Sequence, residues 1–448
     1  MSIFKDCDIR GIYPSEIDES DARRVGQTLA TLHPDAQFCV GGDIRLSTPA
    51  LKAAFIEGLV SSGAHVTDLG IIPTPALYFA LAHGGYEGGA TVTASHNPPQ
   101  YNGIKFMFDA MPVTRAGIDA VQFTCEAGVF RQWKGSVAHR DIMPEYLAAL
   151  KARFQAKRPL KVVVDAGNGA MSDAAPAAFR QSGYDVVELF CTPDGAFPGR
   201  NPNPAEYRHL GAVCAKVVET GADFGVAFDG DGDRVVFIDE TGCALQNEKS
   251  LALFIRYLLK DRPTPVVYDQ KSSSVVRQTA LAMGGTPVPE RSGHAFIKRR
   301  FLELGAAIAG EVSGHFFFGE LGYDDGLFAA LTMADIIVEA GDTLSGLTRD
   351  IVCPPITPDL RVPCPYAVQD QWLRRIEALA EGQPCQVSRM DGVRLEFPDG
   401  WLLVRKSVTA EQITLRAEAE TPGRLRAILE MAANALPQSA RRAILEDV

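Results

Sequence analysis

The sequence predicts an α/β protein with three topologically similar α/β domains, whose sheets are mixed but largely parallel, and a C-terminal α+β domain. Three observations support this prediction. The chain of 448 residues is too long for a single hydrophobic core. A strand–helix–strand pattern, which is typical of parallel sheets, occurs three times. After about residue 351 the chain becomes rich in proline, which favours an extended linker, and the pattern then changes.

The first strand–helix–strand unit follows a short, turn-rich segment. Ser47 is placed as the N-cap of its second helix, and Pro49 falls in the first turn, where proline is tolerated. Further on, Asn102 and Gly103 predict a turn between two strands. The expected elements are helices over 18–32 and 48–62 and strands over 38–41, 65–69, 89–92 and 104–108.

The same pattern is expected twice more, and a polar connector over 127–146 joins the first two units. The expected strands of the second and third units cover 161–165, 184–189, 224–228, 234–238 and 264–269, and a helix opens at 271–274. A stiff linker is expected over 354–365. Beyond it, helices over 368–381 and 424–435 and strands over 392–397, 401–405 and 412–417 predict an antiparallel α+β domain. The predicted domains are 1–140, 141–246, 247–352 and 353–448.

The composition is that of an ordinary globular protein, with 46% hydrophobic and 22% charged residues. A formal net charge of −11 argues against nucleic acid as the main partner but leaves room for a locally basic cleft. No apolar run approaches the ~18 residues that span a bilayer, and no signal-peptide core is present. Nine scattered cysteines without C-x-x-C pairs indicate reduced thiols. We therefore expect a cytoplasmic protein that does not bind a membrane.

A polar loop after the expected strand 89–92 contains the first candidate for chemistry. It reads Thr93-Ala94-Ser95-His96-Asn97-Pro98, and its prolines prevent the strand from continuing. Lys105 follows Ser95 by ten residues. The loop is either an ordinary turn or a site for a nucleophile or phosphoryl group. A serine hydrolase built on Ser95 and His96 is disfavoured, because side chains of adjacent residues rarely point at one another.

The second candidate is the run Asp229-Gly230-Asp231-Gly232-Asp233-Arg234. Three carboxylates at alternate positions can surround one small cation, and oxygen ligands suit Mg²⁺ or Ca²⁺. An acidic turn without a metal is one alternative. An EF-hand is another, with Glu240 at its twelfth position, but the residues between form an apolar strand. We therefore predict a metal loop at the end of a buried strand, with coordination positions left for water and a phosphate oxygen.

Two further loops have side chains suited to a sugar phosphate. In Gly310-Glu311-Val312-Ser313-Gly314-His315, a carboxylate and a hydroxyl two residues apart can bind adjacent sugar hydroxyls. In Arg405-Lys406-Ser407-Val408-Thr409, a cation and two hydroxyls suit a phosphate group. Each loop alone has low specificity.

Taken together and in this order, the four loops resemble those of the α-D-phosphohexomutases, and most closely the bacterial phosphomannomutase/phosphoglucomutase branch. Further matching segments are 8–11, 73–75, 165–169 and 292–298. The resemblance implies four domains round a central cleft, and an enzyme that interconverts hexose 1-phosphate and hexose 6-phosphate. It also implies a phosphoserine, Mg²⁺ and a hexose 1,6-bisphosphate as activator and intermediate. Sugar phosphates are the expected partners of a monomer or weak dimer.

The resemblance also assigns roles to individual residues. Ser95 is implied as the phosphoserine, and Asp229, Asp231 and Asp233 as holding the metal together with a phosphoserine oxygen. Lys105 and His315 are implied to manage the proton of the sugar hydroxyl, and which of them is the base stays open; a nearby cation can lower the pKa of a lysine. The supporting and substrate-binding residues are His96, Arg234, Arg10, Lys271, His294, Glu311, Ser313, Arg405, Ser407 and Thr409.

Some positions differ from the family's usual residues, and they define the alternatives. Val408 replaces an asparagine in the phosphate loop, and Val312 stands where the two main branches have methionine or glutamine. A phosphoglucosamine mutase is one alternative, against which stands Thr93, where that branch usually has serine. A catalytically silent paralogue that binds sugar phosphates is the other.

Overall fold

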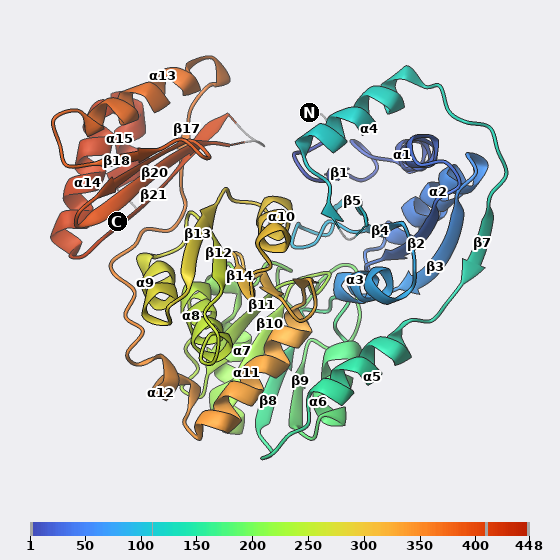
Figure 1. Ribbon diagram of the computed structural model, residues 1–448, viewed down its shortest axis with the longest axis horizontal. Helices are drawn as coiled ribbons and strands as arrows, with labels where there is room; N and C mark the ends of the chain where they lie inside the picture. Colours follow the sequence, from blue (N-terminus) through green and yellow to red (C-terminus); the bar gives the residue numbers. More distant parts are fainter. Residues whose placement is uncertain (1–2, 110, 408–410, 446–448) are drawn as a thin grey trace.

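The computed structural model describes residues 3–109, 111–407 and 411–445, which form four sheets with helices packed against them. Three α/β units follow one another along the chain, and the C-terminal unit, red in Figure 1, lies across from the blue N-terminal unit. Each sheet draws its strands from one stretch of the sequence, which confirms the predicted fold class. The domain boundaries themselves stay a prediction. Within the described residues, no helix is both long and apolar enough to cross a membrane.

The first unit contains a seven-stranded sheet. Its central strand β2 pairs in parallel with β3 and β4, and β5 runs antiparallel to β4. The strands are β1 (Ile9–Ile12), β2 (Gln37–Gly42), β3 (His65–Ile71), β4 (Gly88–Val92), β5 (Tyr101–Phe108), β6 (Met111–Pro112) and β7 (Ser136–His139). The helices are α1 (Glu19–Leu32), α2 (Thr48–Ser61), α3 (Thr74–His83) and α4 (Arg115–Ala127).

The second and third units repeat this arrangement, with a central strand between two parallel neighbours and a fourth strand antiparallel to the third. The second consists of α5 (Met143–Arg153), β8 (Lys161–Asp165), α6 (Ala174–Gln181), β9 (Asp185–Leu189), η1 (Tyr207–His209), α7 (Gly211–Thr220), β10 (Phe224–Phe228) and β11 (Val235–Asp239). The third consists of α8 (Asn247–Leu258), β12 (Pro265–Asp269), α9 (Ser274–Ala282), β13 (Thr286–Glu290), α10 (His294–Leu304), β14 (Ile308–Gly310), β15 (Phe316–Phe318), β16 (Tyr323–Asp324), α11 (Gly326–Ala340) and α12 (Leu344–Thr348).

The C-terminal unit has an antiparallel five-stranded sheet, as predicted. Its elements are β17 (Leu360–Pro363), α13 (Tyr366–Glu377), η2 (Ala378–Ala380), β18 (Gln386–Ser388), β19 (Val393–Phe397), β20 (Gly400–Lys406), β21 (Gln412–Ala419), α14 (Pro422–Ala435) and α15 (Gln438–Leu445). It joins the third unit through ion pairs from Arg416 to Glu248 at 3.0 Å and from Lys271 to Asp359 at 3.1 Å.

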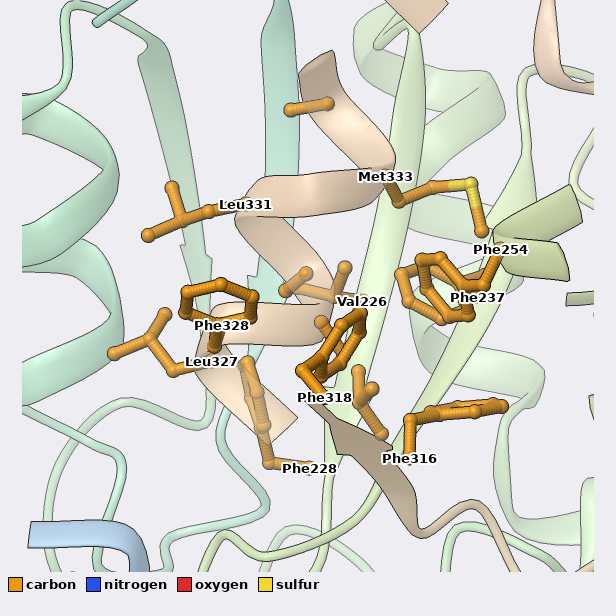
Figure 2. Close-up of a cluster of buried hydrophobic side chains, with 14 of the residues drawn as sticks. Val226, Phe228, Phe237, Phe254, Phe316, Phe318, Leu327, Phe328, Leu331 and Met333 are labelled. Carbon is orange, nitrogen blue, oxygen red and sulfur yellow. The ribbon is translucent and has the colours of Figure 1, made fainter. Parts of the chain in front are cut away.

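One hydrophobic core runs through all three α/β units, and the first unit has a second core in addition. Among the described residues, the C-terminal unit has a core that it shares with no other unit. Figure 2 shows where the second and third units merge. Val226, Phe228 and Phe237 of the second sheet pack against Phe254 of α8 and Phe316 of β15, and α11 covers the group. The two sheets are therefore held in a fixed relation by shared side chains.

Three local predictions were wrong, and a fourth was right in position only. Asn102 and Gly103 lie within β5 and form no turn: the Asn102 side chain donates to Ser47 Oγ at 2.8 Å, and a Cβ at Gly103 would lie 2.1 Å from the Ile9 carbonyl oxygen. Ser47 is the N-cap residue of α2, as predicted, but its side chain makes no capping hydrogen bond. The expected connector 127–146 includes β7, which adds an edge strand beside β3. The expected linker 354–365 includes β17, which pairs with β21.

Candidate active site

Ser95 lies on the loop between β4 and β5, at the end of a fully buried strand. Its φ of +50° is in the left-handed region, which residues other than glycine rarely adopt and which often marks functional sites. The backbone N–H of Ser95 donates to Thr93 Oγ1 at 2.8 Å. Its hydroxyl is buried and donates to Asp229 Oδ2 at 2.8 Å. The two candidate loops, 134 residues apart in sequence, therefore meet at this hydrogen bond.

His96 lies beside Ser95, with its Nδ1 3.3 Å from the serine hydroxyl. The expectation that these adjacent side chains do not approach one another was therefore wrong. The contact is longer than the one from Ser95 to Asp229. Burial, together with the cations Arg234 and Arg10, holds the pKa of His96 well below its usual range. The imidazole is therefore neutral.

The three aspartates follow β10 and are fully buried. One carboxylate oxygen from each lies within 4.8 Å of the others. Among the described residues, Oδ1 of Asp231 and Oδ1 of Asp233 have no hydrogen-bond partner. Leaving buried charged oxygens without a partner is costly, and a cation held between them would offset that cost. The donor set therefore fits a hard divalent cation.

Gly230 explains how the serine loop and the aspartate loop come so close. A Cβ at this position would lie 2.5 Å from the carbonyl oxygen of Ser95. Only glycine lets the two backbones approach this closely, and the Ser95–Asp229 hydrogen bond depends on that approach.

The aspartates differ in their proton affinities. Burial, reinforced by the charges of Asp231 and Asp233, raises the pKa of Asp229 well above its usual range. Burial acts in the same direction on Asp231, but Lys105 outweighs it and holds that pKa below its usual range. Thr74 Oγ1 also donates to Asp231 Oδ2 at 2.7 Å.

Lys105, on β5, binds two of the aspartates. Its Nζ lies 2.9 Å from Asp231 Oδ2 and 2.8 Å from Asp233 Oδ2. Burial alone would lower the pKa of Lys105, but the two carboxylates raise it above its usual value. The direction is opposite to that expected from a neighbouring cation, because the structure places carboxylates around the ammonium.

His315 connects the third unit to the site. Its Nδ1 lies 2.7 Å from Asp324 Oδ2, and its Nε2 accepts a hydrogen bond from Arg234 Nε at 2.9 Å. Because a guanidinium can only donate, Nε2 carries no proton and Nδ1–H donates to Asp324. Both ring nitrogens of His315 are thus engaged by protein partners.

Asp324 was missed as a site residue, although the sequence shows it in an Asp-Asp-Gly run. Its other oxygen lies 2.8 Å from His294 Nε2, so one carboxylate orients both histidines. Burial opposes ionisation, but His294 and His315 hold the pKa of Asp324 well below its usual range. The neighbouring Asp325 has a different task, because it caps α11 by accepting from Leu327 N at 2.8 Å.

Glu311 and Ser313, the two residues predicted to bind sugar hydroxyls, contact each other. Ser313 Oγ donates to Glu311 Oε2 at 2.9 Å, and the backbone N–H of Gly293 donates to Glu311 Oε1 at 2.9 Å. Both side chains therefore have protein partners in this structure, and neither lines the central cavity.

The predicted phosphate-binding cations lie around the same region. Arg10 of β1 donates to Asn97 Oδ1 at 2.8 Å and also pairs with Asp8. Arg405 of β20 pairs with Asp391 at 3.1 Å. The backbone N–H of Ser407 donates to the Gln412 carbonyl at 3.0 Å. Thr409 lies outside the described residues.

A central cavity of about 790 Å³ joins these groups. Its lining includes residues from every unit, and its charged members are mostly cations, which favours an anionic ligand. The site residues that line it are Arg10, His96, Lys105, Arg234, His294, His315 and Arg405. Arg361, which the sequence analysis did not single out, also lines it.

Comparisons with known proteins agree over nearly the whole chain. Family models described as phosphoglucomutase/phosphomannomutase, alpha/beta/alpha domains I, II and III, match residues 1–129, 144–242 and 246–353. A phosphomannomutase/phosphoglucomutase from Pseudomonas syringae pv. tomato is 35% identical, over 95% of this chain and 93% of its own length. A phosphoglucomutase from Neisseria gonorrhoeae is 34% identical, over 94% and 93%.

Solved structures show the same similarity. The crystal structure of a phosphoglucomutase/phosphomannomutase family protein from Burkholderia thailandensis superposes with a TM-score of 0.91 at 33% identity, covering 98% of this chain and 97% of that one. A phosphoglucomutase from Paramecium, in an open form, shares the fold with a TM-score of 0.76 at 17% identity, covering 98% and 95%.

Proposed function

The chain belongs to the α-D-phosphohexomutases, the phosphoglucomutase/phosphomannomutase family, and we propose that it interconverts the 1-phosphates and 6-phosphates of mannose, glucose or both. Ser95 is the phosphoryl carrier in this proposal. The observation that carries it is the 2.8 Å hydrogen bond from the Ser95 hydroxyl to Asp229, beside a cavity lined with cations. An ordinary turn does not require a buried serine hydroxyl bonded to one carboxylate of a cluster of three.

Mg²⁺ is the proposed metal, and the buried unpartnered oxygens of Asp231 and Asp233 support this choice. Asp229, Asp231 and Asp233 would hold it, with an oxygen of phosphorylated Ser95 completing the set. Once bound, Mg²⁺ offsets negative charge on the transferring phosphoryl group. Lys105, held between two of these carboxylates, adds a fixed positive charge at the same place.

The proposed reaction has two transfers. In the first, the free sugar hydroxyl attacks the phosphorus on Ser95, so that a new P–O bond forms as the bond to Ser95 Oγ breaks. The hydroxyl loses its proton, and the product is a hexose 1,6-bisphosphate. This intermediate turns round in the cavity and returns its other phosphoryl group to Ser95 by the reverse steps.

Lys105 and His315 remain the two alternatives for the proton acceptor. Lys105 carries its own proton in the arrangement described, and the Nε2 lone pair of His315 is taken by Arg234. Either group must therefore exchange a partner when substrate binds. Asp324 fixes His315 in the tautomer that leaves Nε2 as the acceptor.

The remaining side chains are proposed to bind the sugar phosphate. The phosphate that is not transferred would be held by the C-terminal loop, where Arg405 can donate bidentately. Glu311 and Ser313 would exchange their mutual hydrogen bond for two ring hydroxyls. The full proposed set is Arg10, His96, Arg234, Lys271, His294, Glu311, Ser313, Arg405, Ser407 and Thr409.

One experiment tests this proposal and separates the alternatives. The purified protein is analysed by intact mass and assayed with the 1-phosphates of mannose, glucose and glucosamine, in the presence of Mg²⁺ and glucose 1,6-bisphosphate. We expect a phosphate-sized mass increase that maps to Ser95, and turnover of mannose or glucose 1-phosphate. Turnover of glucosamine 1-phosphate alone would identify a phosphoglucosamine mutase instead. Phosphorylation without turnover of any of the three would identify a silent paralogue.

A further inference from the structure

A buried arginine outside the lining of the central cavity donates four hydrogen bonds to the loop that carries Ser95. Arg45 follows β2, and its side chain is fully buried. One guanidinium nitrogen, Nη1, donates to the carbonyls of Pro98 and Tyr101, at 2.8 and 3.0 Å. The other, Nη2, donates to the carbonyls of Ser95 and Asn97, both at 2.7 Å. A single planar group thus binds four carbonyls of the loop that carries the serine.

Asp43 fixes the arginine and extends the network to the Ser95 amide. Its carboxylate accepts from Arg45 Nε at 3.0 Å and from Thr93 Oγ1 at 2.6 Å. The same threonine oxygen accepts the Ser95 N–H at 2.8 Å. Ser95 is therefore held from its amide side through Thr93 and from its carbonyl side by Arg45, and these bonds keep it at its left-handed φ.

The second α/β unit has the same device at the equivalent strand end. Asp165 ends β8, the central strand of its sheet, and Arg200 Nε donates to it at 2.7 Å. Arg200 Nη2 donates to the Phe228 carbonyl at 2.7 Å, directly before Asp229. Asp43 and Asp165 thus lie at equivalent places, at or just beyond the end of the central strand. Each accepts a hydrogen bond from a buried arginine, which in turn binds backbone carbonyls beyond or at the end of a neighbouring strand.

We call an arginine that is held by such an aspartate and binds backbone carbonyls a clamp. The third unit has the equivalent aspartate, but among the described residues no arginine pairs with it. Asp269 ends β12 and accepts from the backbone N–H of Lys271 at 2.9 Å, as Asp43 accepts from that of Arg45 at 3.0 Å. The Lys271 ammonium instead lies 3.1 Å from Asp359 of the C-terminal unit. Among the residues that the structure describes, the clamp is therefore present only in the two units whose loops meet at the Ser95–Asp229 hydrogen bond.

We propose that Arg45, held by Asp43, is a positioning residue that keeps the Ser95 hydroxyl aligned for phosphoryl transfer. This inference rests on the proposed function for its kinetic consequence, although not for its structural one. Lysine at this position would keep the charge and the pair with Asp43 but could not bind four carbonyls, because only the planar fork presents its donors in fixed directions. A misplacement of about 1 Å in a reacting group can cost about 100-fold in rate.

The kinetic test compares Arg45→Lys with a matched control in the same unit. Lys52 is also mostly buried and binds a carboxylate, Asp68 Oδ1 at 2.5 Å, and a loop carbonyl, Gly70 O at 3.1 Å, away from the cavity lining. We expect Arg45→Lys to lower kcat about 100-fold while KM changes less than about 3-fold. Lys52→Met should lose thermal stability but keep kcat. An Arg45→Lys protein with kcat within about 3-fold of the native value would overturn the proposal.

Two further measurements decide the question if this variant does not fold or if the native protein shows no turnover. Thr93→Val keeps the side-chain shape but removes the link between Asp43 and the Ser95 amide, and it should lower kcat in the same way. Amide hydrogen exchange over residues 93–101 needs no activity. It should be at least about 10-fold faster in Arg45→Lys or Thr93→Val than in Lys52→Met. Unchanged exchange would overturn the clamp itself, whereas an inactive native protein with the expected exchange would refute only the proposed function.

Discussion

Replacing Gly230 with alanine tests whether catalysis depends on the close approach of the serine and aspartate loops. The added Cβ would lie 2.5 Å from the Ser95 carbonyl oxygen, whereas ordinary contact begins at about 3.4 Å. If the loops separate to relieve this clash, they must move apart by about 0.9 Å. The hydrogen bond from Ser95 Oγ to Asp229, now 2.8 Å, would then lengthen beyond bonding distance.

The expected result is a loss of about 100-fold in kcat, because about 1 Å is enough to misalign a transferring group. The assay is mutase turnover of glucose 1-phosphate coupled to oxidation of the 6-phosphate, with thermal unfolding measured in parallel. Gly211→Ala is the matched control, since a Cβ there meets nothing within 4 Å. If Gly230→Ala kept kcat within about 3-fold of the native value while remaining folded, the loops would not need this contact, and the argument would be refuted.

Three other predictions concern the carrier, the metal and a buried charge. Ser95→Ala should remove the phosphate-sized mass increase and lower turnover by at least about 10⁴-fold without changing the unfolding temperature; retained turnover would rule out Ser95 as carrier. Chelation of divalent metal should abolish activity reversibly, and Asp231→Asn should weaken Mg²⁺ activation, so an enzyme indifferent to EDTA would exclude the metal role. Burial lowers the pKa of Lys298 to about 8, because its ammonium faces the Tyr78 ring and Met107 Sδ and no carboxylate lies in contact with it among the described residues. Because the unfolded chain binds this proton more tightly, the free energy of unfolding should rise between about pH 8 and pH 10.5, and Lys298→Met should abolish that rise in chemical denaturation measured across this range.

The sequence predicted best where a motif packs several unusual residues together. The Asp229–Asp233 run combines alternating charge with glycines, and both properties follow from what a small metal loop needs. Ser95 was ambiguous by itself, because a serine between a strand and two prolines is also good turn chemistry. The aspartate loop, which lies within hydrogen-bond distance of Ser95, favours the second interpretation, a site for a nucleophile or phosphoryl group.

Residues that act through distant partners were harder to predict. Nothing local distinguishes Arg45 from an exposed arginine, since its four carbonyl partners lie 50 to 56 residues further along the chain. Asp324 stood in a recognisable acidic run, yet its role depends on two histidines from different elements. Burial in a folded core decides both roles, and periodicity does not encode it.

Local rules failed where tertiary contacts overrode them. Asn102-Gly103 is a strong turn signal, but Gly103 is needed for β5 to pass close to β1, and the Asn102 amide is used inside the sheet. β7 and β17 are short edge strands among polar or proline-rich residues. Their pairing depends on the exposed edge of a sheet already built, which a local pattern does not contain.

The continuous core has a consequence for how this chain can change over evolutionary time. Three units of shared topology suggest a duplicated ancestor, but Phe237, Phe254 and Phe316 now interlock across the junction of the second and third units, and the same core continues into the first. Exchanging or deleting one unit by recombination would expose part of the core of another. The C-terminal unit, whose apolar residues pack among themselves, is the one segment that shuffling can replace whole. We expect diversification of this architecture to proceed by substitution in the first three units and by replacement in the fourth.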